Sequence, residues 1–181
     1  SHILMRPDVP EERRLDFVRT IQQETLRLTS MTSDFLDLAR LESGRARFVR
    51  EPFEILELVM ECAGIVQPQA NNRSIAFRVE LAEAPSRVSG DRAKIKQVVL
   101  NLLTNAIKYN REGGAITVRG SRRESFFELS VGDTGRGIPP ESLPRVFEKF
   151  YRVADAEGWT QGTGLGLAIA KKIAETHGGE M

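Results

Sequence analysis

Residues 11–43 constrain the fold most, because this stretch contains neither glycine nor proline. Such a stretch predicts one helix, roughly 50 Å long at 1.5 Å per residue. Its apolar residues recur at steps of 4, 7, 3, 4 and 3, the heptad spacing of a helical bundle: Phe17, Ile21, Leu28, Met31, Phe35 and Leu38. A one-sided helix of this length needs a partner surface for its apolar seam. The spacing favours dimerisation through a helical bundle, and packing on its own domain is the alternative.

The rest of the chain alternates between strand and helix patterns. Strands are predicted over residues 48–53, 74–81, 115–120 and 126–131, and helices over 55–69, 91–109, 141–150 and 164–177. Pro68 is expected to end the helix that starts at residue 55, and Asp91 to cap the next one. This order predicts an α+β domain in which helices cover one face of a mixed sheet.

Charge and cysteine content restrict the partners and the compartment. The 26 Lys and Arg residues nearly balance the 25 Asp and Glu residues, so nucleic acid is not an expected partner. The single cysteine excludes an intrachain disulfide and favours a reducing compartment. No apolar run approaches the roughly 20 residues needed to span a bilayer. We therefore expect a cytoplasmic chain without a membrane segment, although a longer parent protein could be membrane-anchored.

The helix predicted over residues 91–109 has an unusual polar face. Lys94, Gln97, Asn101, Asn105 and Lys108 lie within about 80° of one another on a helical wheel. A solvated face would instead carry Glu paired with Lys, and two asparagines in mid-helix cost stability. Amide oxygens can ligate Mg²⁺ together with substrate phosphates, and a lysine can hold phosphate. The pattern fits a metal–polyphosphate site, with surface or buried structural amides as the alternative.

Two glycine clusters follow this helix. In the first, Asp133 precedes two glycines after a predicted strand, so its carboxylate could accept a hydrogen bond from the exocyclic amine of adenine. In the second, Gly162, Gly164 and Gly166 open the last helix, where bare N–H groups can bind an anion. Ordinary glycine turns are the alternative for both. Neither cluster matches the dinucleotide fingerprint, and no phosphate-loop motif occurs in the chain.

The segment between the two clusters has two parts. Residues 147–152 read Phe-Glu-Lys-Phe-Tyr-Arg, and an aromatic pair at this spacing is more typical of a core than of a cofactor site. Residues 153–161 have no periodicity. They predict a loop that could act as a lid over the glycines.

Taken in this order, the blocks resemble the catalytic ATP-binding domain of bacterial sensor histidine kinases. Residues 101–109 resemble the N box, 133–138 the first glycine box, 147–152 the F box and 162–167 the second glycine box. The leading helix, which ends in Asp-Leu-Ala-Arg-Leu-Glu-Ser-Gly, resembles the second helix of the dimerisation and phosphotransfer domain. Four blocks in register make the resemblance specific.

The resemblance implies a two-layer α/β sandwich with a Bergerat-type ATP site, preceded by one long helix. It divides the chain into a tag remnant and linker at residues 1–10, part of a dimerisation and phosphotransfer domain at 11–44, and the catalytic domain at 45–181. From the resemblance we expect the terminal strand pair of the family to be missing after Gly179.

The resemblance also implies the ligands ATP and Mg²⁺ and a role for each matching residue. Asn105 is expected to ligate Mg²⁺, Asn101 to lie near the phosphates and Lys108 to contact phosphate, and these three are the expected catalytic residues. The other expected ATP-binding residues are Tyr109, Asp133, Gly135, Gly137 and Ile138 around the adenine, Gly162, Thr163, Gly164, Leu165 and Gly166 around the phosphates, and Lys149 and Arg152 toward the γ-phosphate.

The implied activity is transfer of the ATP γ-phosphoryl group to a histidine on an acceptor helix of the same or a partner kinase. A response regulator is the implied partner, and the helix at residues 11–44 could form a homodimer. The related ATPases carry a Glu general base at the position of Asn101, and an amide cannot accept a proton at neutral pH. This difference favours a kinase over a hydrolase.

The acceptor block Ser-His-Glu-Leu-Arg-x-Pro is absent from the chain. His2 lies in the expected tag remnant, and His177 matches a structural position of the family. The chain is therefore not expected to phosphorylate itself. Three alternatives stay open: a non-catalytic nucleotide-binding or dimerisation module, a related ATPase or serine kinase, and a plain α+β domain with glycine turns.

Overall fold

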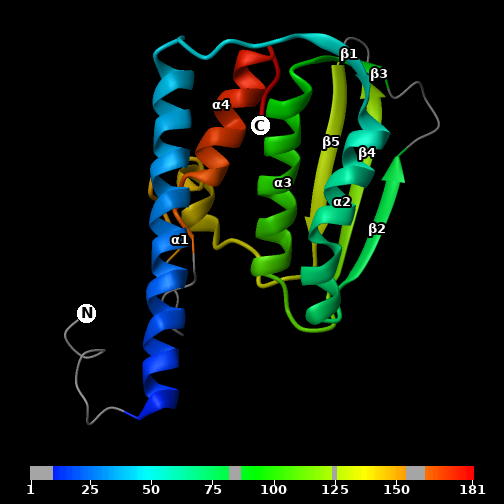
Figure 1. Cartoon of the computed structure of the whole chain (residues 1–181). Helices are drawn as coiled ribbons and strands as arrows, with labels where there is room; N and C mark the ends of the chain where they lie inside the picture. Colours follow the sequence, from blue (N-terminus) through cyan, green and yellow to red (C-terminus); the bar gives the residue numbers. More distant parts are fainter. Residues whose placement is uncertain (1–9, 82–86, 124–125, 154–161) are drawn as a thin grey trace.

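The computed structural model describes residues 10–81, 87–123, 126–153 and 162–181. A layer of helices covers one face of a sheet, and the long helix α1 lies on the outer side of that layer, against α4 (Figure 1). The helices are α1 (Glu11–Glu42), α2 (Ile55–Asn72), α3 (Arg92–Lys108) and α4 (Gly166–Thr176), with a 3₁₀ turn η2 (Pro140–Arg145). This arrangement confirms the predicted two-layer α/β sandwich preceded by one long helix.

The strands form two small sheets. Strand β1 (Glu51–Glu54) pairs antiparallel with β3 (Arg87–Gly90). Strand β4 (Ala115–Arg123) lies between β2 (Ala76–Leu81), which runs parallel to it, and β5 (Phe126–Asp133), which runs antiparallel. The mixed sheet was predicted. Strand β3 was missed, because four residues that read Arg-Val-Ser-Gly give no recognisable alternation.

The main core joins α2 and α3 to the sheet. Leu58, Leu103 and Ile116 are fully buried there, one from each of α2, α3 and β4. The predicted stop of α2 at Pro68 is wrong, since the helix continues to Asn72. Val66 and Ala70, on either side of the proline, are both buried, and their packing outweighs the backbone hydrogen bond that proline cannot donate.

The long helix α1 packs on its own domain over its C-terminal part only. Leu38 and Leu41 form a second core with Leu165, Ile169 and Ile173 around the start and middle of α4. Most of the predicted heptad seam is exposed, with Leu28 at 61% and Phe35 at 53%. Within the described residues, no helix is both long and apolar enough to cross a membrane.

The linker between α1 and β1 is fastened at the N-terminal end of α3. One Asp91 carboxylate oxygen accepts the Lys94 N–H at 3.0 Å, as predicted for an N-cap, and the other accepts the linker Val49 N–H at 3.0 Å. The Asp91 N–H in turn donates to His177 Nε2 at 2.9 Å, at the end of α4. The His177 ring meets Phe48 of the linker edge to face. Asp91 thus joins three segments that are far apart in the sequence.

Two substitutions of Asp91 separate its role as the N-cap of α3 from its role as the acceptor for the linker Val49 N–H. Asp91→Ala loses both acceptors and is expected to destabilise the fold by about 2–4 kcal/mol. Asp91→Asn keeps one oxygen, and asparagine caps helices as well as aspartate does, so it is expected to lose only about half of that. Urea unfolding measures both changes, and an Asp91→Asn variant as unstable as Asp91→Ala would contradict the division of roles.

The free energy of unfolding should depend on pH more strongly in the wild-type chain than in Asp91→Asn. Burial alone would raise the pKa of the Asp91 carboxyl, but hydrogen bonds from the Val49, Lys94 and Ala93 backbone N–H groups outweigh it and leave the pKa below its usual value. Because the folded-state pKa is lowered, this carboxylate stabilises the fold above its unfolded-state pKa. Its contribution is lost as the pH falls through the folded-state pKa. The wild-type chain should therefore lose more stability on acidification than Asp91→Asn.

Candidate functional site

A pocket of about 500 Å³ lies at the C-terminal end of α3. Its walls come from α3, the end of β5 and the turn that follows, residues 146–153, the glycine turn before α4, and α1. The sequence-predicted residues that line it are Asn101, Asn105, Lys108, Tyr109, Asp133, Gly137, Ile138, Arg152, Gly162, Thr163, Gly164 and Gly166. Residues from all four sequence blocks therefore meet in one cavity.

The two asparagines of α3 have different surroundings. Asn101 donates from its amide nitrogen to the Gly166 carbonyl at 3.0 Å, which ties α3 to the start of α4. Asn105, one turn further along, is half-buried and lines the pocket, and its side chain has no hydrogen bond with any described residue. Because a polar group removed from water usually finds a partner, the Asn105 amide is available to a bound molecule.

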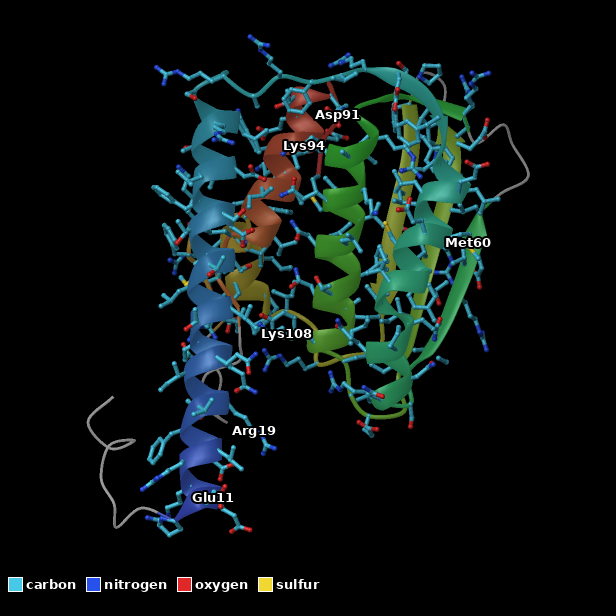
Figure 2. All side chains as sticks on the ribbon, in the orientation of Figure 1. Glu11, Arg19, Met60, Asp91, Lys94 and Lys108 are labelled. Carbon is cyan, nitrogen blue, oxygen red and sulfur yellow. The ribbon has the colours of Figure 1, made fainter. Side chains whose placement is uncertain are left out.

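The end of α3 brings a cation to the second glycine cluster. The Lys108 ammonium donates to the Tyr109 hydroxyl at 3.0 Å, and a Cβ on Gly162 would lie 2.6 Å from the same nitrogen. The lack of a side chain at Gly162 therefore leaves room for the Lys108 ammonium group. The Tyr109 ring also lies beneath the Arg136 guanidinium, 4.8 Å from the ring centroid. Figure 2 shows Lys108 at the end of α3 far from Lys94 and Asp91.

The first glycine cluster forms a tight turn after β5. The Gly135 N–H donates to Asp133 Oδ1 at 2.8 Å, and the Arg136 N–H donates to the Tyr109 carbonyl at 3.3 Å. A Cβ on Gly135 would collide with that same carbonyl oxygen, so this position requires glycine. The Asp133 carboxylate is exposed at the pocket wall and is held in place by the turn that it closes.

The second glycine cluster is hydrogen-bonded to Phe150, the second phenylalanine of residues 147–152. The Phe150 N–H donates to the Gly164 carbonyl at 2.9 Å. Both residues have positive φ, +62° for Phe150 and +72° for Gly164, and a Cβ on Gly164 would lie 2.9 Å from the Phe150 backbone. A phenylalanine at positive φ is strained, and such strain persists only where the surroundings enforce it.

Several of the predicted residues lie outside the pocket lining. Lys149 pairs with Glu42 of α1 at 2.7 Å. Lys94 and Gln97, on the polar face of α3, both contact the Asp37 carboxylate of α1. Leu165 is buried in the core between α1 and α4, and Gly135 lies close to the Tyr109 carbonyl. The N-terminal half of the polar face of α3 thus contacts α1, while its C-terminal half, from Asn101 to Lys108, faces the pocket.

Other lining residues were missed by the sequence reasoning. Ser30 and Asp34 come from α1, which the sequence linked only to dimerisation. Tyr151 and Arg136 lie inside recognised blocks without having been singled out. The expected lid falls almost entirely on residues 154–161, outside the described residues. No signal in the α1 sequence marks Asp34 as a pocket residue, since its neighbours follow the ordinary pattern of a bundle helix.

Asp34 has an unusual environment for a carboxylate. It accepts a hydrogen bond from the Thr163 hydroxyl at 3.2 Å. Burial raises its pKa above the usual value, the Thr163 bond partly offsets this, and the nearby Asp37 carboxylate raises it further. Among the described residues, no cluster of three His, Cys, Asp or Glu side chains could hold a metal ion. A metal here would need amide oxygens and the ligand's own oxygens.

The fold and the pocket together define a nucleotide-binding α+β domain, with glycine turns at two walls and an amide-bearing helix at a third. The sequence model of the family described as "Histidine kinase-, DNA gyrase B-, and HSP90-like ATPase" matches residues 90–181. The chain belongs to this family. Its match begins at the residue before Asp91, so it covers α3, the central hairpin, both glycine clusters and α4.

Within the family, the chain is similar to sensor histidine kinases. It is 33% identical over 170 residues to histidine protein kinase DivJ of Caulobacter vibrioides, covering 94% of this chain and 28% of that protein. It is 35% identical over 171 residues to sensor histidine kinase WalK of Bacillus subtilis, covering 91% of this chain and 27% of that protein. The chain therefore spans about a third or less of the length of these curated relatives.

Solved structures give the same result. The catalytic domain of histidine kinase ThkA superposes with a TM-score of 0.64 at 32% identity, covering 71% of this chain and 83% of that chain. ThkA in complex with response regulator protein TrrA superposes with a TM-score of 0.74 at 29% identity, covering 95% of this chain and 47% of that chain. The globular part of the chain is thus an ATP-binding catalytic domain of the sensor histidine kinase type.

Proposed function

We propose that this domain binds ATP with Mg²⁺ and transfers the γ-phosphoryl group to a histidine on an acceptor helix of the same or a partner kinase. The observation that carries the proposal is the half-buried Asn105 amide, which lines the pocket and has no partner among the described residues. It lies on the same helix face as Lys108, beside a glycine turn. Amide, ammonium and bare backbone N–H groups are the groups that a magnesium polyphosphate needs.

The adenine end of the proposed site is the turn after β5. Asp133 uses Oδ1 to hold the Gly135 N–H, so Oδ2 can accept a hydrogen bond from the exocyclic amine of the base. Tyr109, Gly137 and Ile138 would flank the ring. A guanine base presents a carbonyl instead of this amine, so the same carboxylate would disfavour it.

The phosphate end of the proposed site is the second glycine cluster. Lys108 lies against Gly162 and would contact a phosphate as a point charge. The remaining proposed phosphate contacts are Thr163, Gly164, Gly166 and Arg152 in the lining, Leu165 through its position in the turn, and Lys149 once its pair with Glu42 opens.

The metal would be held by the Asn105 amide oxygen, with Asn101 beside it. Both are hard oxygen donors on one helix face, a fitting partial ligand set for Mg²⁺, which takes its remaining ligands from phosphates and water. When bound, the ion would neutralise charge on the phosphate chain. Asn101 is already fixed by its bond to Gly166, so it would hold its side chain in position without reorganisation.

In the proposed reaction an imidazole nitrogen attacks the γ-phosphorus in line, and the bond to the β-phosphate oxygen breaks to release ADP. Asn101 occupies the position at which the related ATPases carry a Glu general base, so no carboxylate at this position would activate water as a competing nucleophile. An amide cannot take a proton from water at neutral pH. The residues of this chain therefore bind and orient ATP, and the nucleophile comes from outside the pocket.

A transfer assay tests this function. The chain is incubated with Mg²⁺ and γ-labelled ATP together with separately produced acceptor-helix domains of the related kinases DivJ and WalK. We expect label on the acceptor domain that is lost in acid and kept in base, as a phosphorus–nitrogen bond requires. The matched control is the same acceptor with its histidine replaced by glutamine.

Three results would contradict this function. Tight ATP binding with no labelled acceptor would favour a non-catalytic nucleotide-binding module. Steady release of inorganic phosphate by the isolated chain would favour a related ATPase, and label on serine would favour a serine kinase. Both measurements use the same reaction mixture, so one experiment separates the alternatives.

We also propose two partners and the division of the chain at residue 44. Residues 11–44 would pair with a second copy, because Ile21, Leu28 and Phe35 of the heptad seam are exposed. A response regulator would receive the phosphoryl group from the acceptor histidine, as the ThkA complex with response regulator protein TrrA suggests for this family.

A further inference from the structure

Helix α1 contributes a carboxylate to the phosphate end of the pocket. Asp34 lines the cavity together with Ser30, and it accepts the Thr163 hydroxyl hydrogen bond at 3.2 Å. The same hydroxyl accepts the Leu165 N–H at 3.2 Å, so it is fixed within the glycine turn. Asp34 therefore lies directly beside the turn that would hold the phosphates.

Among the residues that the structure describes, no cation forms an ion pair with Asp34. Arg27, the preceding cation of α1, pairs with Glu24 at 3.1 Å. Lys94 pairs with the other nearby carboxylate, Asp37, at 3.4 Å. A half-buried negative charge with a hydroxyl as its partner is electrostatically unfavourable next to any further anion.

The docking of α1 holds this carboxylate in place. Leu38 and Leu41, one and two turns beyond Asp34, are buried against α4. The Lys149–Glu42 pair at 2.7 Å and the Lys94–Asp37 pair fasten the same part of the helix to two further segments. Separation of this part of α1 from the domain would take Asp34 out of the pocket.

We propose that Asp34 makes the docked α1 select against the triphosphate, so that ATP binds more weakly than ADP while α1 is docked. This inference rests on the proposed nucleotide site. ATP carries one more negative charge than ADP on the phosphate chain, and in the proposed site that chain would extend from Lys108 toward the turn that Asp34 contacts. The added repulsion falls on ATP and hardly on ADP.

The coupling works in both directions. If docking of α1 lowers the affinity for ATP, binding of ATP must weaken the docking of α1 by the same factor. The contacts of α1 then change with the nucleotide in the pocket, ADP being compatible with the docked helix and ATP favouring its release. The proposed coupling depends on the charge of the Asp34 carboxylate and on its hydrogen bond with the Thr163 hydroxyl.

Titration calorimetry with MgATP and MgADP tests the proposal on the whole chain. Asp34→Asn keeps an oxygen that can accept the Thr163 bond and removes only the charge. We expect it to tighten ATP binding about tenfold and to change ADP binding less than about twofold. Asp16→Asn is the matched control, because it removes the same charge from the same helix at an exposed carboxylate that neither lines the pocket nor pairs with the rest of the domain. It should leave the ratio of the two affinities unchanged.

Each outcome decides the matter. Unchanged ATP binding in Asp34→Asn overturns the proposal, and weaker MgATP binding overturns it by making Asp34 a metal ligand. Equal tightening of ATP and ADP overturns it by making loosening of α1 the cause, and the same effect in Asp16→Asn overturns it by making the net charge of α1 the cause. If neither nucleotide binds any variant, including the unaltered chain, the proposed nucleotide site itself fails. Measurable ADP binding throughout separates the two proposals.

Discussion

Replacement of Asn105 by alanine is expected to abolish Mg²⁺-dependent ATP binding and to lower phosphoryl transfer by about two orders of magnitude or more. The amide lines the pocket without a partner among the described residues, so its loss breaks no contact of the fold. Alanine also has the higher helix propensity. The variant should therefore fold at least as stably as the unaltered chain while losing its ligand.

Thermal unfolding with and without MgATP measures this effect. A ligand at about 100 times its Kd adds about 2.7 kcal/mol of stability, which raises the Tm of a chain of this size by roughly 5–10 °C. The shift should vanish in Asn105→Ala and persist in Asn72→Ala, the same substitution at an exposed position at the end of α2. An undiminished shift in Asn105→Ala would remove this residue from the site.

The sequence predicted the parts of the site that are local in the chain. The spacing of Asn101, Asn105 and Lys108 fixes one face of a helix, whatever the rest of the fold does. Asp91 was recognised as an N-cap because capping needs only the three residues that follow it. The glycine clusters were recognised for the same reason, since their conformations are set within a few residues.

The sequence could not predict contacts between distant elements. The N-terminal part of the polar face of α3 was expected to belong to the ligand site, yet Lys94 and Gln97 contact Asp37 of α1. A polar helix face indicates that its side chains need hydrogen-bonding partners, but it does not show whether these come from a ligand or from another helix. The second acceptor role of Asp91, toward Val49, is invisible for the same reason, because the two positions are 42 residues apart.

Propensity was overruled where packing was strong. Pro68 is a helix breaker by its own chemistry, yet α2 passes through it because Val66 and Ala70 are both buried. Strand β3 formed from a sequence with no strand signal, because β1 offers it an antiparallel partner. In both cases tertiary contacts that span many residues outweighed the local preference.

Gly164→Ala is expected to damage both the stability of the fold and the phosphate end of the pocket. Its φ of +72° costs an alanine about 1–2 kcal/mol, and the new Cβ would lie 2.9 Å from the Phe150 backbone. That backbone cannot simply move aside, because the Phe150 N–H is bonded to the Gly164 carbonyl at 2.9 Å. Relief of the clash must open the glycine turn, and with it the proposed phosphate cradle.

Gly113→Ala is the matched control for this substitution. Gly113 has a φ of +66° and lies outside the pocket lining, and a Cβ there would have nothing within 4 Å. It isolates the backbone cost, so urea unfolding should show a loss of about 1–2 kcal/mol for Gly113→Ala and a larger loss for Gly164→Ala. Calorimetry should show ATP binding intact in the first and weakened at least about thirtyfold in the second. Equal losses of stability, with ATP binding retained in both, would mean that the turn yields without cost and that its strained pair with Phe150 does not shape the site.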